Sequence, residues 1–172
     1  MDKAIVVEML SGSDKFPLHL LLLADETVAA INKYLYISDV YVAKEVLSEH
    51  VIAVFVLQKL NSKEIEIKNI AVDEVYQGRG IGSFLIEKIK QIALEEGMKI
   101  LCVGTPDSAT RQLNFYLRNG FRKAGVRKNF FTENYLEPIY ENGILLRDMV
   151  MLQIYLTRQN DATKTELNNS RR

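Results

Sequence analysis

The sequence has few of the residues that crosslink or interrupt a fold. It contains one cysteine, three prolines, two histidines and no tryptophan among 172 residues. A single cysteine, Cys102, excludes an intrachain disulfide, and His19 and His50 cannot complete a zinc cage with it at any recognised spacing. We therefore expect no metal centre, and we expect a reducing, cytoplasmic location for the protein.

The sequence also lacks an excess of charge and a long hydrophobic run. Lys+Arg and Asp+Glu both number 22, so the formal net charge at pH 7 is zero. Nucleic-acid binders rely on a positive field, so nucleic acid is not an expected partner. The longest apolar stretch, around residues 20–24, is far shorter than the ~20 residues of a membrane span. We therefore expect no membrane association, no signal peptide and no anchor.

Enough apolar sequence is present for one hydrophobic core. Hydrophobic residues make up 48% of the chain. A chain of this length buries about 70% of the surface that its unfolded form exposes, which is enough to fold without disulfides or metals. We expect a single domain over residues 1–157, followed by a polar, flexible tail over residues 158–172 that shows no periodicity.

The spacing of apolar residues predicts a mixed α/β domain. Strand patterns and helical patterns alternate along the chain, and glycines or short polar segments separate them. The expected strands cover residues 4–10, 40–46, 51–60, 64–73, 99–103, 121–131 and 149–156, of which the second to fourth form antiparallel neighbours. The expected helices lie within residues 18–34, after Gly82 as far as Gly97, and after residues 105–108 as far as Gly120.

A glycine-rich segment at the start of one predicted helix is the strongest candidate site. Gly78, Gly80 and Gly82 leave no Cβ in front of successive amides, so the N–H groups can form a concavity that binds phosphate. Ser83 follows the last glycine where a P-loop would require lysine, which disfavours triphosphate hydrolysis. About seventy residues of strand-rich sequence precede the segment, which disfavours a dinucleotide fold. A tight turn with no ligand is the alternative.

Two motifs together resemble a known family. Residues 77–82 have the pattern Gln-x-x-Gly-x-Gly after a short strand, and residues 115–121 have an aromatic residue, Tyr116, a three-residue spacer and Gly-Phe. This pair resembles the GCN5-related N-acetyltransferase (GNAT) family, whose members transfer an acyl group from acyl-coenzyme A to an amine. The resemblance extends to about Leu156, and residues 137–149 resemble an uncharacterised bacterial branch.

The resemblance implies both a fold and an activity. The implied fold is the acyl-CoA N-acyltransferase fold, a mostly antiparallel mixed sheet of about six to seven strands flanked by about four helices. A splayed, V-shaped opening would separate the strand before the glycine loop from the next strand. The implied activity is transfer of acetyl from acetyl-CoA to a primary amine of a small molecule or peptide, by direct attack in a ternary complex without a metal.

The resemblance also assigns the residues that would bind coenzyme A. The loop amides would hold the pyrophosphate, and Arg79 would add a charge-assisted contact. The Ile70 N–H would donate to the thioester oxygen. Asp107 stands near the start of the next helix, where related sequences often carry Asn, and helix capping explains it equally well. The full implied set is Ile70, Ala71, Val72, Gln77, Gly78, Arg79, Gly80, Ile81, Gly82, Ser83 and Asp107.

Proton transfer in such a reaction requires an acid and a base. Tyr116 could protonate the departing thiolate, and a core tyrosine with a backbone partner is the alternative. An amine of pKa ~10.4 is almost fully protonated at pH 7, and deprotonating it costs about 4.6 kcal/mol. Glu66 resembles the catalytic glutamate of the histone-modifying members. A water relay is one alternative, and a solvated strand face that carries Glu64, Glu66 and Lys68 is another.

The remaining candidates concern the acceptor and the partners. Aromatic residues in the insertion between the last two strands could line an acceptor pocket or form a homodimer interface. Nearby glutamates could attract a cationic amine. These residues are Phe130, Phe131, Glu133, Tyr135, Glu137, Tyr140 and Glu141. Cys102 is expected to be buried and unreactive. A coenzyme A binding module without catalysis and a pure scaffold are the rival functions.

Overall fold

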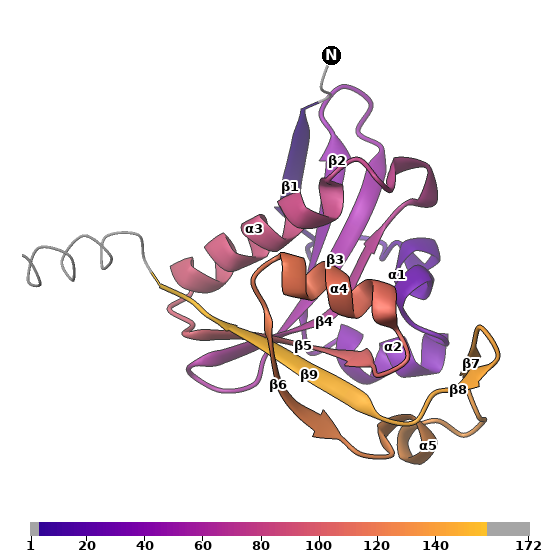
Figure 1. The fold of residues 1–172 in the computed structure, drawn as a ribbon. Helices are drawn as coiled ribbons and strands as arrows, with labels where there is room; N and C mark the ends of the chain where they lie inside the picture. The colour runs from indigo at the N-terminus through magenta and orange to yellow at the C-terminus, as the bar shows by residue number, and fades with distance from the viewer. Residues whose placement is uncertain (1–3, 158–172) are drawn as a thin grey trace, which may run out of the picture.

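The computed structural model describes residues 4–157, so the tail predicted over residues 158–172 lies outside the described residues. A seven-stranded sheet with the order β1-β2-β3-β4-β5-β9-β6 forms the centre (Figure 1). Its strands are β1 (Ile5–Met9), β2 (Asp39–Glu45), β3 (Val51–Lys59), β4 (Glu64–Val72), β5 (Ile100–Pro106), β6 (Arg122–Arg127) and β9 (Met149–Tyr155). The helices are α1 (Leu18–Ala24), α2 (Val28–Leu35), the 3-10 turn η1 (Glu74–Tyr76), α3 (Ile81–Glu95), α4 (Thr110–Arg118) and α5 (Phe130–Asn134). This architecture confirms the predicted fold class.

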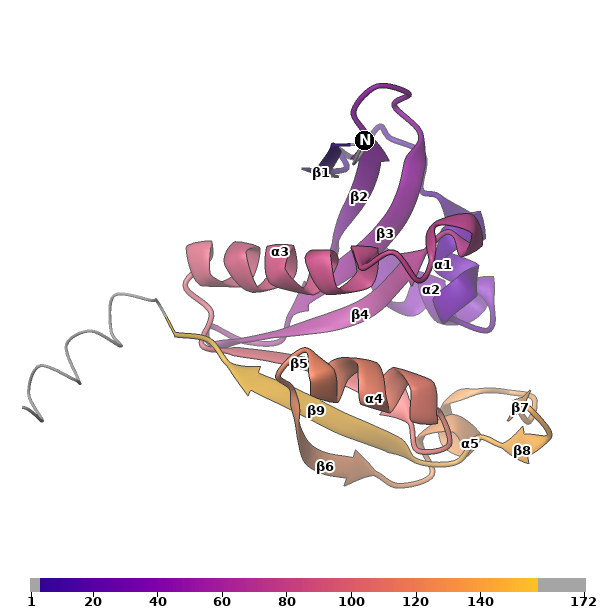
Figure 2. The same ribbon diagram turned by 45° about the horizontal axis from the view of Figure 1, so that its top comes forward.

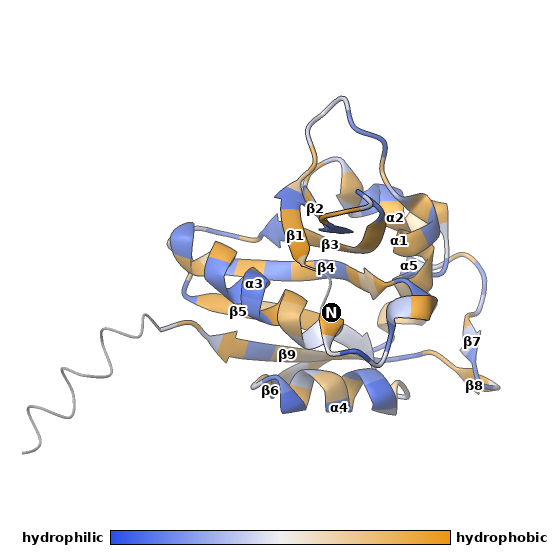
Figure 3. Ribbon diagram, turned by 90° about the horizontal axis from the view of Figure 1, so that it is seen from above, coloured by the Kyte–Doolittle hydropathy of each residue, from blue (hydrophilic) through white to orange (hydrophobic). Residues whose placement is uncertain are grey.

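Helices cover both faces of the sheet. On one face α1 and α2 pack Leu21, Ile31 and Leu35 against alternate residues of β2 and β3. On the other face α3 and α4 pack against the opposite set of strand residues. Hydrophilic and hydrophobic residues alternate along α3 and α4 (Figure 3), as expected for helices with one buried side. Each fully buried Leu, Ile or Phe contributes roughly 1.5–3 kcal/mol.

The sheet opens between its two central strands. β4 pairs with β5 in parallel only from Glu64↔Ile100 to Ile67↔Val103. Beyond that point β4 continues along β3, and β5 continues along β9 as far as Pro106↔Met149. Figure 2 shows β4 and β5 diverging in this region. The predicted V-shaped opening is therefore present, and it is the position at which a ligand can enter the sheet.

A β-bulge lies in β4 just before the opening. Val56 pairs with Asn69 and Leu57 pairs with Ile67, so Lys68 is the extra residue. A bulge re-aims the side chains that follow it. As a result Asn69 and Ala71 face the α1 and α2 side, where Ala71 joins the cluster of buried residues and Asn69 donates to Leu21 O at 2.9 Å. Ile70 packs against the core on the opposite face.

Several predicted boundaries were wrong. Asp107 does not cap a helix, because β5 runs on to Pro106 and the Asp107 amide donates to Asp148 O at 3.1 Å. α4 starts at Thr110, and its N-cap, Ala109, provides no side-chain cap. The strand predicted over residues 121–131 ends at Arg127, and the insertion after it forms α5 and a small hairpin, β7 (Tyr140–Glu141) and β8 (Ile144–Leu145).

Within residues 4–157, no helix is long and apolar enough to cross a membrane.

Candidate functional site

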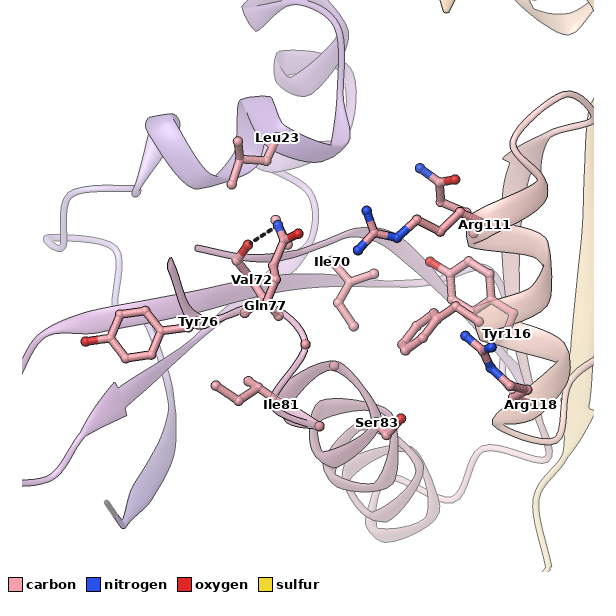
Figure 4. Close-up of a pocket in the computed structure, with 16 residues that line it drawn as sticks. Leu23, Ile70, Val72, Tyr76, Gln77, Ile81, Ser83, Arg111, Tyr116 and Arg118 are labelled. Carbon is pink, nitrogen blue, oxygen red and sulfur yellow. Dashed lines mark hydrogen bonds between the residues drawn. The ribbon is translucent and has the colours of Figure 1, made fainter. Parts of the chain in front are cut away.

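A cavity of about 540 Å³ occupies the opening beside β4 (Figure 4). The C-terminal half of β4 forms one wall, the glycine loop and the first turn of α3 form the floor, and α4 closes the other side. The lining residues are Leu23, Ile70, Ala71, Val72, Tyr76, Gln77, Gly78, Gly80, Ile81, Gly82, Ser83, Arg111, Gln112, Phe115, Tyr116 and Arg118. Nine of the predicted coenzyme A residues are therefore brought together, and Arg79 and Asp107 are not among the lining residues.

The glycine loop presents the N-terminus of α3 to this cavity. Gly80 is the N-cap residue and has φ +79°, a left-handed conformation that L side chains rarely adopt. No side chain caps α3, so its first amides, at Ile81, Gly82 and Ser83, keep their donors available on the cavity side. A Cβ at Gly82 would lie 3.1 Å from the Phe115 ring, so glycine allows α3 and α4 to approach closely. This arrangement is suited to an anion.

Polar side chains position the loop and add positive charge. The Gln77 side-chain amide donates to the Val72 carbonyl at 2.9 Å, which ties the loop to the end of β4. The exposed Arg79 guanidinium instead stacks over the Tyr76 ring, 5.3 Å from its centroid. Arg111 reaches from α4 toward β4, and Arg118 also lines the cavity (Figure 4). The sequence analysis missed these two arginines, although both flank Tyr116 on the same predicted helix.

Tyr116 lies at the inner end of the cavity. Its side chain is buried and makes edge-to-face contacts with Phe115 and Phe121, with centroids 5.2 and 5.5 Å apart. Burial raises the pKa of the Tyr116 phenol well above its ordinary value. The hydroxyl makes no hydrogen bond to another lining residue (Figure 4). The phenol is thus kept protonated and faces the cavity, as a proton donor requires.

A second cavity of about 290 Å³ adjoins the first. The two share Leu23, Ile70, Gln112 and Tyr116 as lining residues. The second cavity extends toward the end of α1, the divergent part of β5 and the insertion after β6. Its further lining includes Asp25, Glu26, Lys68, Asn69, Thr105, Phe131, Tyr135, Glu141 and Met149. Two ligands that occupy these cavities would therefore meet beside Ile70 and Tyr116.

The insertion contributes part of its predicted set to this second cavity. Phe131, Tyr135 and Glu141 line it, and the Tyr135 ring stacks on Phe131 with centroids 5.8 Å apart. Glu133 and Glu137 are exposed and line neither of the two cavities. Tyr140 is 64% exposed, so it forms no part of the pocket. Phe131 and Tyr135 therefore lie where an acceptor pocket would place them, whereas Tyr140 lies on the surface.

Glu66 lies apart from Tyr116. Its side chain is buried, and its carboxylate accepts from Lys68 Nζ at 3.3 Å, so the alternative of a solvated strand face does not hold for Glu66. Glu66 lines a smaller cavity of about 180 Å³. It does not line either of the two cavities that Tyr116 lines. Cys102 pairs with Glu66 across β4 and β5, and burial raises the pKa of its thiol to about 12. Cys102 is half-buried and not fully buried as predicted, while the raised pKa of its thiol agrees with the expected low reactivity.

No cluster of three or more His, Cys, Asp or Glu side chains that could hold a metal ion occurs within residues 4–157.

Comparison with known proteins identifies relatives along most of the chain. Residues 36–123 match the family model described as an acetyltransferase (GNAT) domain. A curated relative from Bacillus subtilis strain 168, the uncharacterized N-acetyltransferase YvbK, is 37% identical over 137 residues, which cover 80% of this chain and 87% of that protein.

Two solved structures share the fold closely. A GNAT family acetyltransferase from Elizabethkingia anophelis with acetyl-CoA bound has a TM-score of 0.84 at 40% identity, covering 91% of this chain and all (100%) of that one. A Bacillus subtilis acetyltransferase in complex with CoA has a TM-score of 0.80 at 34% identity, covering 90% of this chain and 100% of that one.

Proposed function

The chain belongs to the GNAT acetyltransferase family, and from this membership we propose that it transfers the acetyl group of acetyl-CoA directly to a primary amine. The observation that carries the proposal is the meeting of two cavities at Ile70 and Tyr116. One cavity suits a nucleotide diphosphate, the other suits a small acceptor, and a shared wall allows attack without a covalent enzyme intermediate. Proximity of this kind can contribute ~7–11 kcal/mol toward the barrier.

The donor cavity has the features that coenzyme A requires. Amides at the α3 N-terminus and the guanidinium groups of Arg111 and Arg118 provide donors for a diphosphate, and no Cβ lies in front of the loop at Gly78 or Gly80. The backbone of residues 70–72 borders the opening where β5 has diverged, so it can pair with an extended pantetheine arm. Acetyl-CoA would supply an activated acyl group at the inner end.

Ile70 and Tyr116 would then act on the reacting atoms. The Ile70 N–H would donate to the thioester oxygen as negative charge develops there, a contribution of ~3 kcal/mol for a typical oxyanion donor. Tyr116 would give its phenolic proton to the departing sulfur and recover a proton from the new amide nitrogen. This exchange leaves the enzyme unchanged and yields the thiol and the N-acetyl product.

The acceptor and the setting are part of the same proposal. The acceptor is a small molecule or peptide that carries a primary amine, and it enters through the second cavity. The lone cysteine, which is only partly exposed, suits a reducing compartment, so we place the reaction in the cytoplasm.

Two measurements test the proposed function. Titration of acetyl-CoA into the protein should give saturable heat with one site per chain. Thiol release from acetyl-CoA should then depend on an added amine, over a panel of mono- and diamines. Binding without amine-dependent release would identify a coenzyme A binding module, and absence of binding would refute the assignment of the cavity.

A further inference from the structure

Asp25, the C-cap residue of α1, lines the acceptor side of the site. It lines both the 290 Å³ cavity and the 180 Å³ cavity beside it. Tyr34 Oη donates to its Oδ2 at 3.2 Å, and Tyr135 Oη donates to its Oδ1 at 3.2 Å. The Glu26 amide donates to Oδ1 at 2.8 Å. Three donors, from the connection after α1, from α2 and from the insertion, therefore hold this carboxylate in place.

The carboxylate of Asp25 retains capacity for one more donor. A carboxylate offers about four lone-pair sites, and the three hydrogen bonds leave one on Oδ2. Burial raises the pKa of Asp25 above its ordinary value, against the lowering effect of its hydrogen bonds and of Lys68. Asp25 is therefore a stronger base than a solvated carboxylate, and it lies in a cavity that Tyr116 and Ile70 also line.

Negative charge exceeds positive charge around this cavity. Asp25, Glu26 and Glu141 contribute three carboxylates, and Lys68 is the one cationic side chain in the lining. Lys68 is already paired, at 3.3 Å, with Glu66. Glu66 itself does not line this cavity. Burial, and after it the charges of Glu141 and Asp25, raise the pKa of Glu26, so these groups lie close enough to repel one another. A cation between them would relieve the repulsion.

A buried amide in the same wall independently indicates a ligand. Asn69 is 4% exposed and lines the cavity one residue before Ile70. Its Nδ2 donates to the Leu21 carbonyl and to Tyr34 Oη, whereas its Oδ1 has no hydrogen-bond partner. An unpaired buried acceptor is costly unless a donor reaches it. An ammonium group in the cavity would supply that donor.

We propose that this cavity binds a small amine that carries a second positive charge, and that Asp25 removes the proton from the reacting ammonium. Asp25 and the Asn69 Oδ1 would receive the reacting end, and the Glu26 and Glu141 pair would hold the distal cation. The inference rests on the proposed acetyl transfer and names its acceptor class and its base.

The proton balance of the step is complete. The ammonium N–H transfers its proton to Asp25 Oδ2, which leaves a neutral amine and a protonated Asp25 carboxyl. The amine lone pair forms the N–C bond to the acetyl carbon as the C–S bond breaks. The departing thiolate takes the Tyr116 proton, and the remaining extra proton on the new amide nitrogen returns to Tyr116. Asp25 afterwards releases its proton to water, so each turnover liberates one proton overall. Glu66, which lies outside this cavity, takes no part.

The base assignment is tested with Asp25→Asn, Glu66→Gln and Glu95→Gln. Glu95 is an exposed residue near the end of α3 and serves as the charge-matched control. General bases contribute ~10²–10⁴ in rate. We expect Asp25→Asn to lose at least ~10²-fold in kcat/KM at pH 7 while its Kd for acetyl-CoA stays unchanged. The deficit should shrink about tenfold for each pH unit as free amine accumulates. Glu95→Gln should retain the wild-type rate, and Glu66→Gln, which leaves Lys68 unpaired, should keep the wild-type pH dependence of kcat/KM even if it weakens amine binding.

The acceptor class is tested with 1,4-diaminobutane against 4-amino-1-butanol, which has the same length and one charge. The diamine should have at least a tenfold higher kcat/KM and should bind at least tenfold more tightly to the CoA complex by calorimetry. In the Glu26→Gln, Glu141→Gln double variant the ratio between the two amines should fall to about one. High salt should reduce the wild-type ratio, because the recognition is electrostatic.

The outcomes separate this inference from the proposed function. Equal binding and turnover of the two amines, or an Asp25→Asn enzyme as fast as wild type, would overturn the acceptor assignment while acetyl transfer stands. Loss of activity in Glu66→Gln with none in Asp25→Asn would also overturn it. Tight diamine binding without any thiol release would support the cavity and refute the transfer.

Discussion

Tyr116 carries a hydroxyl and lines both cavities, which gives the first prediction. Tyr116→Phe should lower kcat about 10²-fold, because the thiolate would leave without a general acid. The Kd for acetyl-CoA should stay unchanged, because the hydroxyl makes no hydrogen bond to the other lining residues (Figure 4). Steady-state kinetics and calorimetry measure the two quantities.

Tyr41→Phe is the matched control for this substitution. Tyr41 is also a buried tyrosine, stacked on Phe55 with centroids 4.9 Å apart, but it lines neither cavity of the site. Its loss of a hydroxyl should leave kcat unchanged. A Tyr116→Phe enzyme with wild-type kcat on a good amine would show that Tyr116 is a packing residue.

Cys102 provides a second prediction at this scale. With a pKa of about 12, about one thiol in 10⁴ is ionised at pH 8, compared with about one in ten at the ordinary value of 9.0. Iodoacetamide should therefore modify folded protein roughly 10³-fold more slowly than protein in urea, with a rate that rises tenfold per pH unit. Mass spectrometry follows the modification. Rapid alkylation of the folded protein would contradict the burial.

The sequence identified residues whose role follows from a motif and missed those whose role follows from position. Tyr116 and the glycine loop stand in recognisable patterns, and the structure brings them to one cavity. Asp25 carries no local pattern, because its partners Tyr34 and Tyr135 lie 9 and 110 residues away. Glu66 resembled a base in sequence, yet the bulge and strand alternation place it on another wall.

At the scale of elements, the entry into α3 depends on the conformation of one residue. Gly80 has φ +79°, and a Cβ there would meet no atom within 4 Å, so a substitution costs conformational energy without a clash. Gly80→Ala should destabilise the protein by about 1 kcal/mol. Gly80→Asn should cost less, because Asn tolerates this region better. Urea unfolding measures both.

The order of these two variants is what tests the argument. Equal stability of wild type and Gly80→Ala, or a larger loss for Asn than for Ala, would mean that the loop relaxes to another conformation. Neither variant removes a side-chain contact, so packing cannot explain a difference between them.

Element types followed from periodicity, whereas element ends depended on tertiary pairing. Polar and turn-forming residues at positions 105–108 suggested a helix start, but pairing with β9 extends β5 to Pro106, and the Asp107 amide continues toward Asp148. Likewise, Phe130 and Phe131 were predicted to continue a strand, yet they begin α5. In α5 the Phe131 side chain is buried and lines the 290 Å³ cavity. Local propensity could not anticipate either contact.

At the scale of the whole molecule, the sheet consists of two parts joined by a short parallel contact. β1 to β4 form one part, and β5, β9 and β6 form the other, with four paired positions between them. The order of strands and helices was predictable, and so was the opening once the family resemblance was noted. The cavities were not, since their walls come from α1, α4 and the insertion together.

Hydrogen exchange should reveal the opening and its ligand. In the free protein, amides of residues 70–72 that face the opening should exchange faster than those of residues 64–67, which pair with β5. Saturating acetyl-CoA should slow exchange at residues 70–72 and 81–83, because in the proposed complex the arm would pair with β4 and the diphosphate would bind the α3 amides. Residues 64–67 serve as the internal control.

Tyr116→Phe should show the same protection with acetyl-CoA as the wild type, since the substitution should remove catalysis and not binding. Protection confined to β6 and β9 would place the ligand elsewhere, and it would remove the geometric basis for transfer at Ile70.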